Sequence, residues 1–120
     1  MPAWVNSDHL TILGFLGMAM AGADHLSLQG YELQKAFPGV ADHRAAVSLP
    51  LVDNSQDMEA LAAHVDRRLI ADAAAPAYLI RGHGLYGWGR DIDEAERVVE
   101  ACEVLLACEL ERMKLVEIQA

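Results

Sequence analysis

The stretch LIRGHGLYGWGRD, from Leu79 to Asp91, places one histidine between two glycines directly after a short apolar run. That run, APAYLI at residues 75–80, has the length and composition of a buried strand. Gly82 and Gly84 permit backbone conformations that other residues avoid, and they let a ligand approach closely. Because ligands of α/β proteins bind at the carboxyl ends of strands, His83 is a candidate metal or substrate ligand. A hydrogen-bonded structural histidine is the alternative that the pattern leaves open.

The residues after this stretch predict a long C-terminal helix. Asp91 followed by Glu94 is similar to a capping box at a helix start. Apolar residues then recur every three or four positions as far as Met113, which is typical of a helix with one buried face. Arg112 and Lys114 stand near the expected end, where the helix macrodipole favours cations.

The residues before the stretch predict a further strand and a further helix. AVSLPLV, residues 46–52, is an apolar β-type run, and its Pro50 indicates an edge position or a bulge. Apolar spacing predicts an amphipathic helix over residues 56–70, with Asn54 or Ser55 as its cap.

The first forty residues predict a buried helix and a brief second one. The run from Leu10 to Ala21 is too short to span a bilayer, and no Lys or Arg precedes it as a signal peptide requires. GYELQKAF, residues 30–37, predicts a short helix that ends at a Pro-Gly pair. The order helix, strand, helix, strand, helix predicts one α/β domain over residues 1–120, with helices covering a small sheet.

Composition and charge exclude several classes of partner. The 120 residues are 53% hydrophobic and 22% charged, which fits a globular protein with a core. A formal net charge of −9 argues against nucleic acid and against an anionic membrane, because both need a basic face. Cys102 and Cys108 are six apart, on different sides of the predicted helix, so we expect two reduced core thiols and a cytoplasmic protein.

Glu32 is the second candidate functional residue. A carboxylate on a short helix after a glycine can act as a general acid/base if its pocket desolvates it. Lys35 lies one turn further on, so an ordinary surface ion pair is the alternative. The histidines at positions 9, 25, 43 and 64 lack the H-x-H or i, i+4 spacing of a metal site, and we expect them at the surface or at caps.

Two segments resemble a known family. QGYELQKAFPGVADHRAAVSLPLVDNSQDMEALAAHV, residues 29–65, and AYLIRGHGLYGWGRDIDEAERVVEACEVLLACELERMKL, residues 77–115, resemble the C-terminal half of one branch of the class II aldolase/adducin family. The resemblance extends over about residues 28–115, and RGHGLYGWGRD is its most specific part. It implies a three-layer α/β/α sandwich with a mostly antiparallel sheet, here truncated to its C-terminal portion, and a homo-oligomer.

The resemblance also implies a reaction and roles for both candidates. Members of this branch are hydro-lyases of methionine salvage that remove water from a small sugar phosphate, 5-methylthioribulose 1-phosphate. They use a zinc ion (Zn2+) held by three histidines, the third of which corresponds to His83, and an acid/base glutamate that corresponds to Glu32. Zinc would polarise a carbonyl of the substrate, and the carboxylate would move a proton.

One departure from the family pattern concerns the metal. The other two zinc histidines of the family form an H-T-H-S segment just before the residues that correspond to Val5 and Asn6, where this chain has Met1 to Trp4. One imidazole does not supply the three protein ligands of catalytic zinc. We therefore expect activity only with an N-terminal half as partner. A catalytically inactive α/β assembly module and a relic of a class II sugar-phosphate aldolase remain as alternatives.

Overall fold

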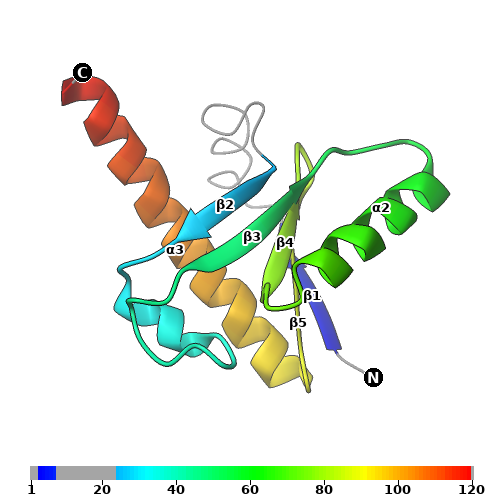
Figure 1. The fold of residues 1–120 in the computed structure, drawn as a ribbon, viewed down its shortest axis with the longest axis horizontal. Coiled ribbons are helices and arrows are strands. Elements are labelled where there is room, and N and C mark those ends of the chain that lie inside the picture. Colours follow the sequence, from blue (N-terminus) through cyan, green and yellow to red (C-terminus); the bar gives the residue numbers. More distant parts are fainter. Residues whose placement is uncertain (1–2, 8–23, 120) are drawn as a thin grey trace.

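The computed structural model describes residues 3–7 and 24–119 (Figure 1). The helix expected from Leu10 and the histidine at position 9 lie outside the described residues. No helix in the described ranges is long and apolar enough to cross a membrane. The elements, in chain order, are β1 (Ala3–Ser7), β2 (His25–Leu28), the 3₁₀ helix η1 (Glu32–Ala36), β3 (Val47–Val52), α2 (Met58–Ala71), β4 (Ala77–Ile80), β5 (Gly84–Gly89) and α3 (Ile92–Gln119).

The five strands form one sheet in the order β1-β5-β4-β3-β2. Three of the four neighbouring pairs are antiparallel, and β3 pairs with β4 in parallel. Helix α2 makes the crossover that a parallel pair requires. The expected α/β class and the mostly antiparallel sheet are therefore confirmed.

The main core lies between the sheet and α3, which runs along one face of the sheet (Figure 1). Alternate residues of β4 and β5 point to this face, and the apolar stripe of α3 packs on them. Each fully buried leucine contributes about 2 kcal/mol by leaving water. The largest side chains that the core buries completely are Phe37, Leu28, Leu49, Leu79, Leu85, Leu105 and Leu106.

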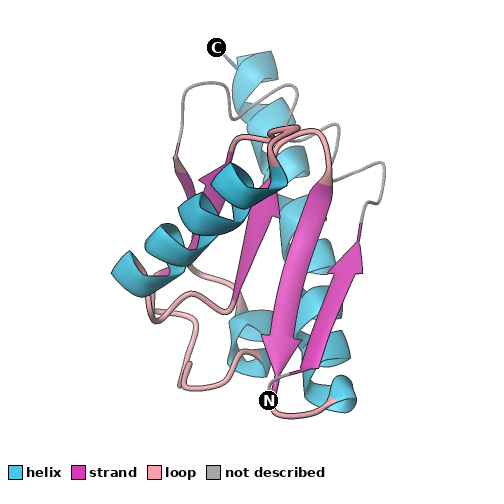
Figure 2. Ribbon diagram, turned by 90° about the vertical axis from the view of Figure 1, so that its right-hand side faces the viewer, coloured by secondary structure: helices cyan, strands magenta, loops and turns pink. Residues whose placement is uncertain are grey.

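Helix α2 covers part of the opposite face of the sheet (Figure 2). Its half-buried residues Leu61, Val65 and Leu69 pack on a smaller cluster that includes Tyr78 and Ile80. No residue of α2 is fully buried, so this layer is packed less tightly than α3. In Figure 2, α2 lies in front of the strands that are farthest from β1.

Both long helices begin at aspartate caps. Oδ1 of Asp91 accepts the backbone N–H of Glu94 at 2.8 Å, and the Glu94 carboxylate accepts the backbone N–H of Arg90, much as the capping box predicted. Helix α2 is capped by Asp57, whose side chain accepts the N–H of Ala60 at 3.1 Å, so the predicted caps two and three residues earlier are wrong. Helix α3 also continues past its predicted end, to Gln119.

Three expectations about strands are corrected. Strands β1 and β5 were not predicted, and His25, expected at the surface or at a cap, lies exposed on β2. Strand β5 contains three glycines, which strands usually avoid, but a Cβ at Gly87 would lie 2.8 Å from Cγ2 of Val99 on α3. Strand β3 is internal although it contains Pro50, because its pairing with β4 begins one residue later, at Leu51.

The two cysteines differ in their surroundings. Cys102 is buried in the core and free, as expected, whereas Cys108 is exposed and free. The prediction of two core thiols is therefore half right. Burial raises the pKa of the Cys102 thiol to about 12, so it stays protonated and unreactive in the folded chain.

Candidate functional site

His83 lies on the tight turn that joins β4 to β5. Gly82 adopts a φ of 69°, in the left-handed region that favours glycine, and the N–H of His83 donates to the carbonyl of Ile80 at 3.0 Å. The side chain is exposed, and its ring makes no hydrogen bond with another described residue. The turn therefore holds an accessible imidazole at the carboxyl end of β4.

The turn is attached to the end of β3 by the residue before Gly82. The N–H of Arg81 donates to the carbonyl of Val52 at 2.9 Å, and Nε of Arg81 lies 2.8 Å from Oδ1 of Asp53. Asp53 is largely exposed, so the ion pair itself contributes at most about 1 kcal/mol. Its effect is to fix the direction in which the chain enters the turn.

An aromatic row continues from His83 along the sheet. The His83 and Tyr86 rings stack with centroids 5.8 Å apart and planes inclined by 22°. Tyr86 also stacks on Tyr78 at 5.3 Å, and Tyr78 lies 6.4 Å from Trp88. Because β5 supplies Tyr86 and Trp88 at alternate positions, the row is a consequence of strand geometry. The stacking limits the orientations of the imidazole.

A second imidazole, His25 at the start of β2, lies at the same end of the sheet. Its Nδ1 lies 2.8 Å from Oδ1 of Asp24, and this hydrogen bond holds the pKa of Asp24 below its usual value. Arg68 of α2 donates to the carbonyls of Leu51 and Asp24 and so attaches α2 to this end of β2 and β3. Within residues 3–7 and 24–119, however, no three His, Cys, Asp or Glu side chains lie close enough together to hold a metal ion.

Glu32 lies on η1 and is exposed. Its carboxylate lies 2.6 Å from Nζ of Lys35 and 2.9 Å from Nδ1 of His43. The hydrogen bond and charge of Lys35 hold the pKa of Glu32 below its usual value. A carboxyl with a lowered pKa is a weak general base near neutral pH, so this arrangement has the features of a surface ion pair.

The structure does not bring Glu32 and His83 together. Helix η1 follows the end of β2 that pairs with the start of β3, at Leu28 and Val47. His83 follows β4 at the end of the sheet where β3 also finishes. At about 3.3 Å per residue, β3 separates these two ends by roughly 16 Å.

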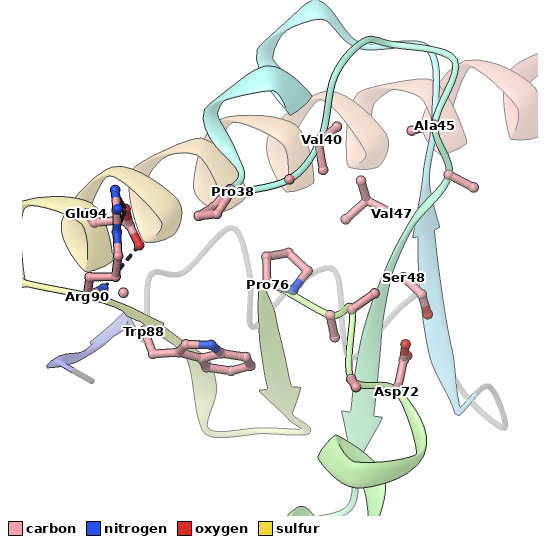
Figure 3. A pocket seen from close by; sticks show the side chains of 16 residues that line it. Pro38, Val40, Ala45, Val47, Ser48, Asp72, Pro76, Trp88, Arg90 and Glu94 are labelled. Atoms are coloured by element: carbon pink, nitrogen blue, oxygen red, sulfur yellow. Dashed lines mark hydrogen bonds and ion pairs between the residues drawn. The ribbon is translucent and has the colours of Figure 1, made fainter. Parts of the chain in front are cut away.

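A cavity at the end of the sheet away from His83 was not predicted. Its volume is about 850 Å³, and it lies between the loop after η1, the α2–β4 loop and the corner between β5 and α3 (Figure 3). Its lining residues come from segments as far apart in the sequence as Pro38 and Glu94. No local pattern could have revealed it, although Pro76 and Trp88 are residue types common in such linings.

Comparison with known proteins identifies the family. Residues 6–110 match the family described as the class II aldolase and adducin N-terminal domain. The chain belongs to the class II aldolase/adducin family. The expected membership is therefore confirmed, and the roles of His83 and Glu32 in such a family member stay predictions.

Two relatives show the degree of similarity. A protein of Xanthomonas oryzae pv. oryzae named methylthioribulose-1-phosphate dehydratase is 54% identical over 111 residues, which are 92% of this chain and 49% of the relative. A protein of Pseudomonas aeruginosa with the same name is 52% identical over 92 residues, 77% of this chain and 45% of the relative. The chain thus spans about half the length of the curated relatives it matches.

Proposed function

We propose that this chain forms the His83-bearing part of a methylthioribulose-1-phosphate dehydratase, a hydro-lyase of methionine salvage that acts on a sugar phosphate. The observation that carries the proposal is the 54% identity, over 92% of the chain, with a protein of that name. The exposed imidazole at the carboxyl ends of β3 and β4 supports it, because ligands of open α/β sheets bind there. We place residues 1–120 in one domain, the C-terminal portion of a three-layer α/β/α sandwich.

Within this proposal, His83 is one ligand of a zinc ion. Catalytic zinc is usually held by three protein ligands with a fourth position open for substrate or water. The described residues offer no such set, so the described part of the chain does not fit zinc by itself. We propose that the other ligands come from an N-terminal half or from a further copy, in a cytoplasmic assembly.

The position of Glu32 constrains that assembly. Glu32 stays in the proposal as the acid/base carboxylate, but it lies at the end of the sheet opposite to His83. With the chain arranged in this way, one site can use both residues only if they come from different chains. Lys35 must also release the carboxylate, because their ion pair lowers the pKa of Glu32.

Co-expression of this chain with the N-terminal half of the Xanthomonas oryzae relative tests the proposal. We expect the complex to bind zinc and to dehydrate 5-methylthioribulose 1-phosphate, and we expect His83→Gln to lose both properties. His64→Gln is the matched control, because His64 lies on α2 and outside the turn. A folded complex that binds no zinc and dehydrates nothing contradicts the proposal and favours an inactive assembly module, and cleavage of a carbon–carbon bond favours an aldolase.

A mixing experiment tests the role of Glu32 separately. We expect Glu32→Gln and His83→Gln chains to be inactive alone and to regain part of the activity when they assemble together, since a mixed site then has one intact copy of each residue. Full activity of Glu32→Gln alone shows that Glu32 is not the acid/base group. Inactive mixtures show that the two residues do not come from different chains.

A further inference from the structure

The 850 Å³ cavity has the size of a small-molecule site and lies apart from the turn that holds His83. Ligand pockets commonly measure about 300–1,000 Å³ and combine apolar walls with a few polar groups. This cavity is bounded by the first residues of β3, by the residues that precede β4 and by the last residues of β5 (Figure 3). All three belong to the end of the sheet opposite to His83.

One wall of the cavity carries two hydrogen-bond acceptors that no other described residue engages. Asp72 is the C-cap residue of α2, and Ser48 lies on β3; both are half-buried. No hydrogen bond or ion pair with another described residue engages the Asp72 carboxylate or the Ser48 hydroxyl. Figure 3 shows the oxygen ends of both side chains directed toward the same part of the cavity. The C-terminal end of α2 adds a partial negative charge beside Asp72.

The positive charge at the other side of the cavity is already neutralised. Arg90 lines that side, and its Nη2 and Nε lie 2.8 and 3.0 Å from Oε2 of Glu94, a buried carboxylate. Among the cavity-lining residues, the charge that no other described residue pairs is therefore the negative charge of Asp72. In a chain with a formal net charge of −9, this balance favours a cationic ligand over an anionic one.

The rest of the lining is apolar and suits a hydrocarbon body. Val40, Pro76 and the indole of Trp88 line the space between Asp72 and the start of α3 (Figure 3). An aromatic ring also attracts an organic cation that comes within about 6 Å of it. A ligand that fits both walls has a positively charged head with N–H donors and a short apolar body.

We propose that this cavity binds a small primary amine, with its ammonium group donating to Asp72 and Ser48 and its apolar body against Pro76 and Trp88. An ammonium group has three N–H donors, enough to satisfy both acceptors and one water molecule. Hydrogen bonds between an ammonium and a carboxylate are about twice as strong as neutral ones, so Asp72 is the main source of selectivity. The site is independent of the proposed dehydratase reaction and does not require a metal ion.

Titration of the isotope-labelled chain with n-hexylamine at pH 7, followed by amide NMR, tests the proposal. We expect the largest shifts at Ser48, at Asp72 and at the Trp88 indole N–H. 1-Hexanol has the same body without the charge, and we expect it to bind about tenfold more weakly. This comparison uses the unmodified chain, so it does not depend on whether a variant folds.

Two variants then locate the charge that selects the amine. Asp72→Asn should weaken n-hexylamine binding about tenfold and leave 1-hexanol binding unchanged. Asp66→Asn makes the same change of charge on α2, at an exposed residue outside the cavity, and should have little effect. Equal binding of amine and alcohol, equal loss in both variants, or the absence of shifts at the cavity residues would overturn the proposal.

Discussion

The hydroxyl of Tyr31 connects η1 to α3, and we expect Tyr31→Phe to lower the free energy of unfolding by about 2 kcal/mol. This hydroxyl donates to Oε1 of Glu109 at 2.7 Å, and Nη2 of Arg112 donates to Oε2 at 2.7 Å. The Glu109 side chain is only 6% exposed, so loss of the hydroxyl leaves a buried carboxylate with one donor fewer. In a chain of this size the melting temperature should fall by roughly 5–10 °C, which circular dichroism measures.

Tyr86→Phe is the matched control for this substitution. It removes the same atom from a half-buried tyrosine whose hydroxyl makes no hydrogen bond with another described residue. We expect its effect to stay below about 0.5 kcal/mol. If both variants lose the same free energy, or if Tyr31→Phe loses none, the hydroxyl of Tyr31 does not stabilise the chain as argued.

The same cluster predicts two pH dependences of opposite sign. Burial and the neighbouring Glu109 raise the pKa of Tyr31 from 10.0 to about 12. The protonated hydroxyl therefore contributes fully to the free energy of unfolding below pH 10, and this contribution is lost as the pH rises through 12. Burial acts to raise the pKa of Glu109, but the donors Arg112 and Tyr31 outweigh it and lower this pKa below 4.5. The contribution of Glu109 is therefore present above pH 4.5 and is lost as the pH falls through its lowered pKa. Urea unfolding should show that Tyr31→Phe loses less stability than the original chain between pH 10 and 12, because the variant lacks this titrating hydroxyl.

Three further predictions concern α3 and its contacts. Asp91→Ala removes the helix cap and should cost about 1 kcal/mol in urea unfolding, whereas Asp91→Asn should cost less. Gly87→Ala places a Cβ 2.8 Å from Cγ2 of Val99 and should lower the free energy of unfolding by about 1–3 kcal/mol. A stability equal to that of the original chain would show that α3 can move away. A maleimide should label Cys108 alone in the folded chain and Cys102 only after unfolding, as mass spectrometry counts the labels; rapid labelling of both contradicts the burial of Cys102.

The elements that the sequence predicted are those whose signals are local. Helix α3 has an apolar stripe and an acidic capping pair, and both can be recognised without knowing what the helix packs against. Strand β5 was missed because the glycine at position 87 is explained only by the approach of Val99, which lies beyond the corner and about two turns into α3. The internal position of Pro50 likewise depends on where the pairing between β3 and β4 begins.

The candidate site shows the same division between local and distant causes. The glycines beside His83 predicted an accessible turn, and the structure has one. The stack on Tyr86 and the link from Arg81 to Asp53 depend on neighbouring strands, so sequence spacing did not reveal them. The ion pair of Glu32 with Lys35 is the alternative that the sequence offered, because its partners are only three residues apart, and the structure has this pair.

The position of β1 in the sheet has a consequence for the order of folding during synthesis. Strand β1 leaves the ribosome before the other described strands, yet its partner is β5, with Ala3 opposite Gly89. At about 5–20 residues per second, the ribosome needs roughly 4–17 s to make the intervening chain. Over residues 77–119, by contrast, β4, β5 and α3 are consecutive and pack on one another. We therefore expect this contiguous unit to form before β1 docks on it, so that a nascent chain stalled before β5 has no strand with which β1 can pair.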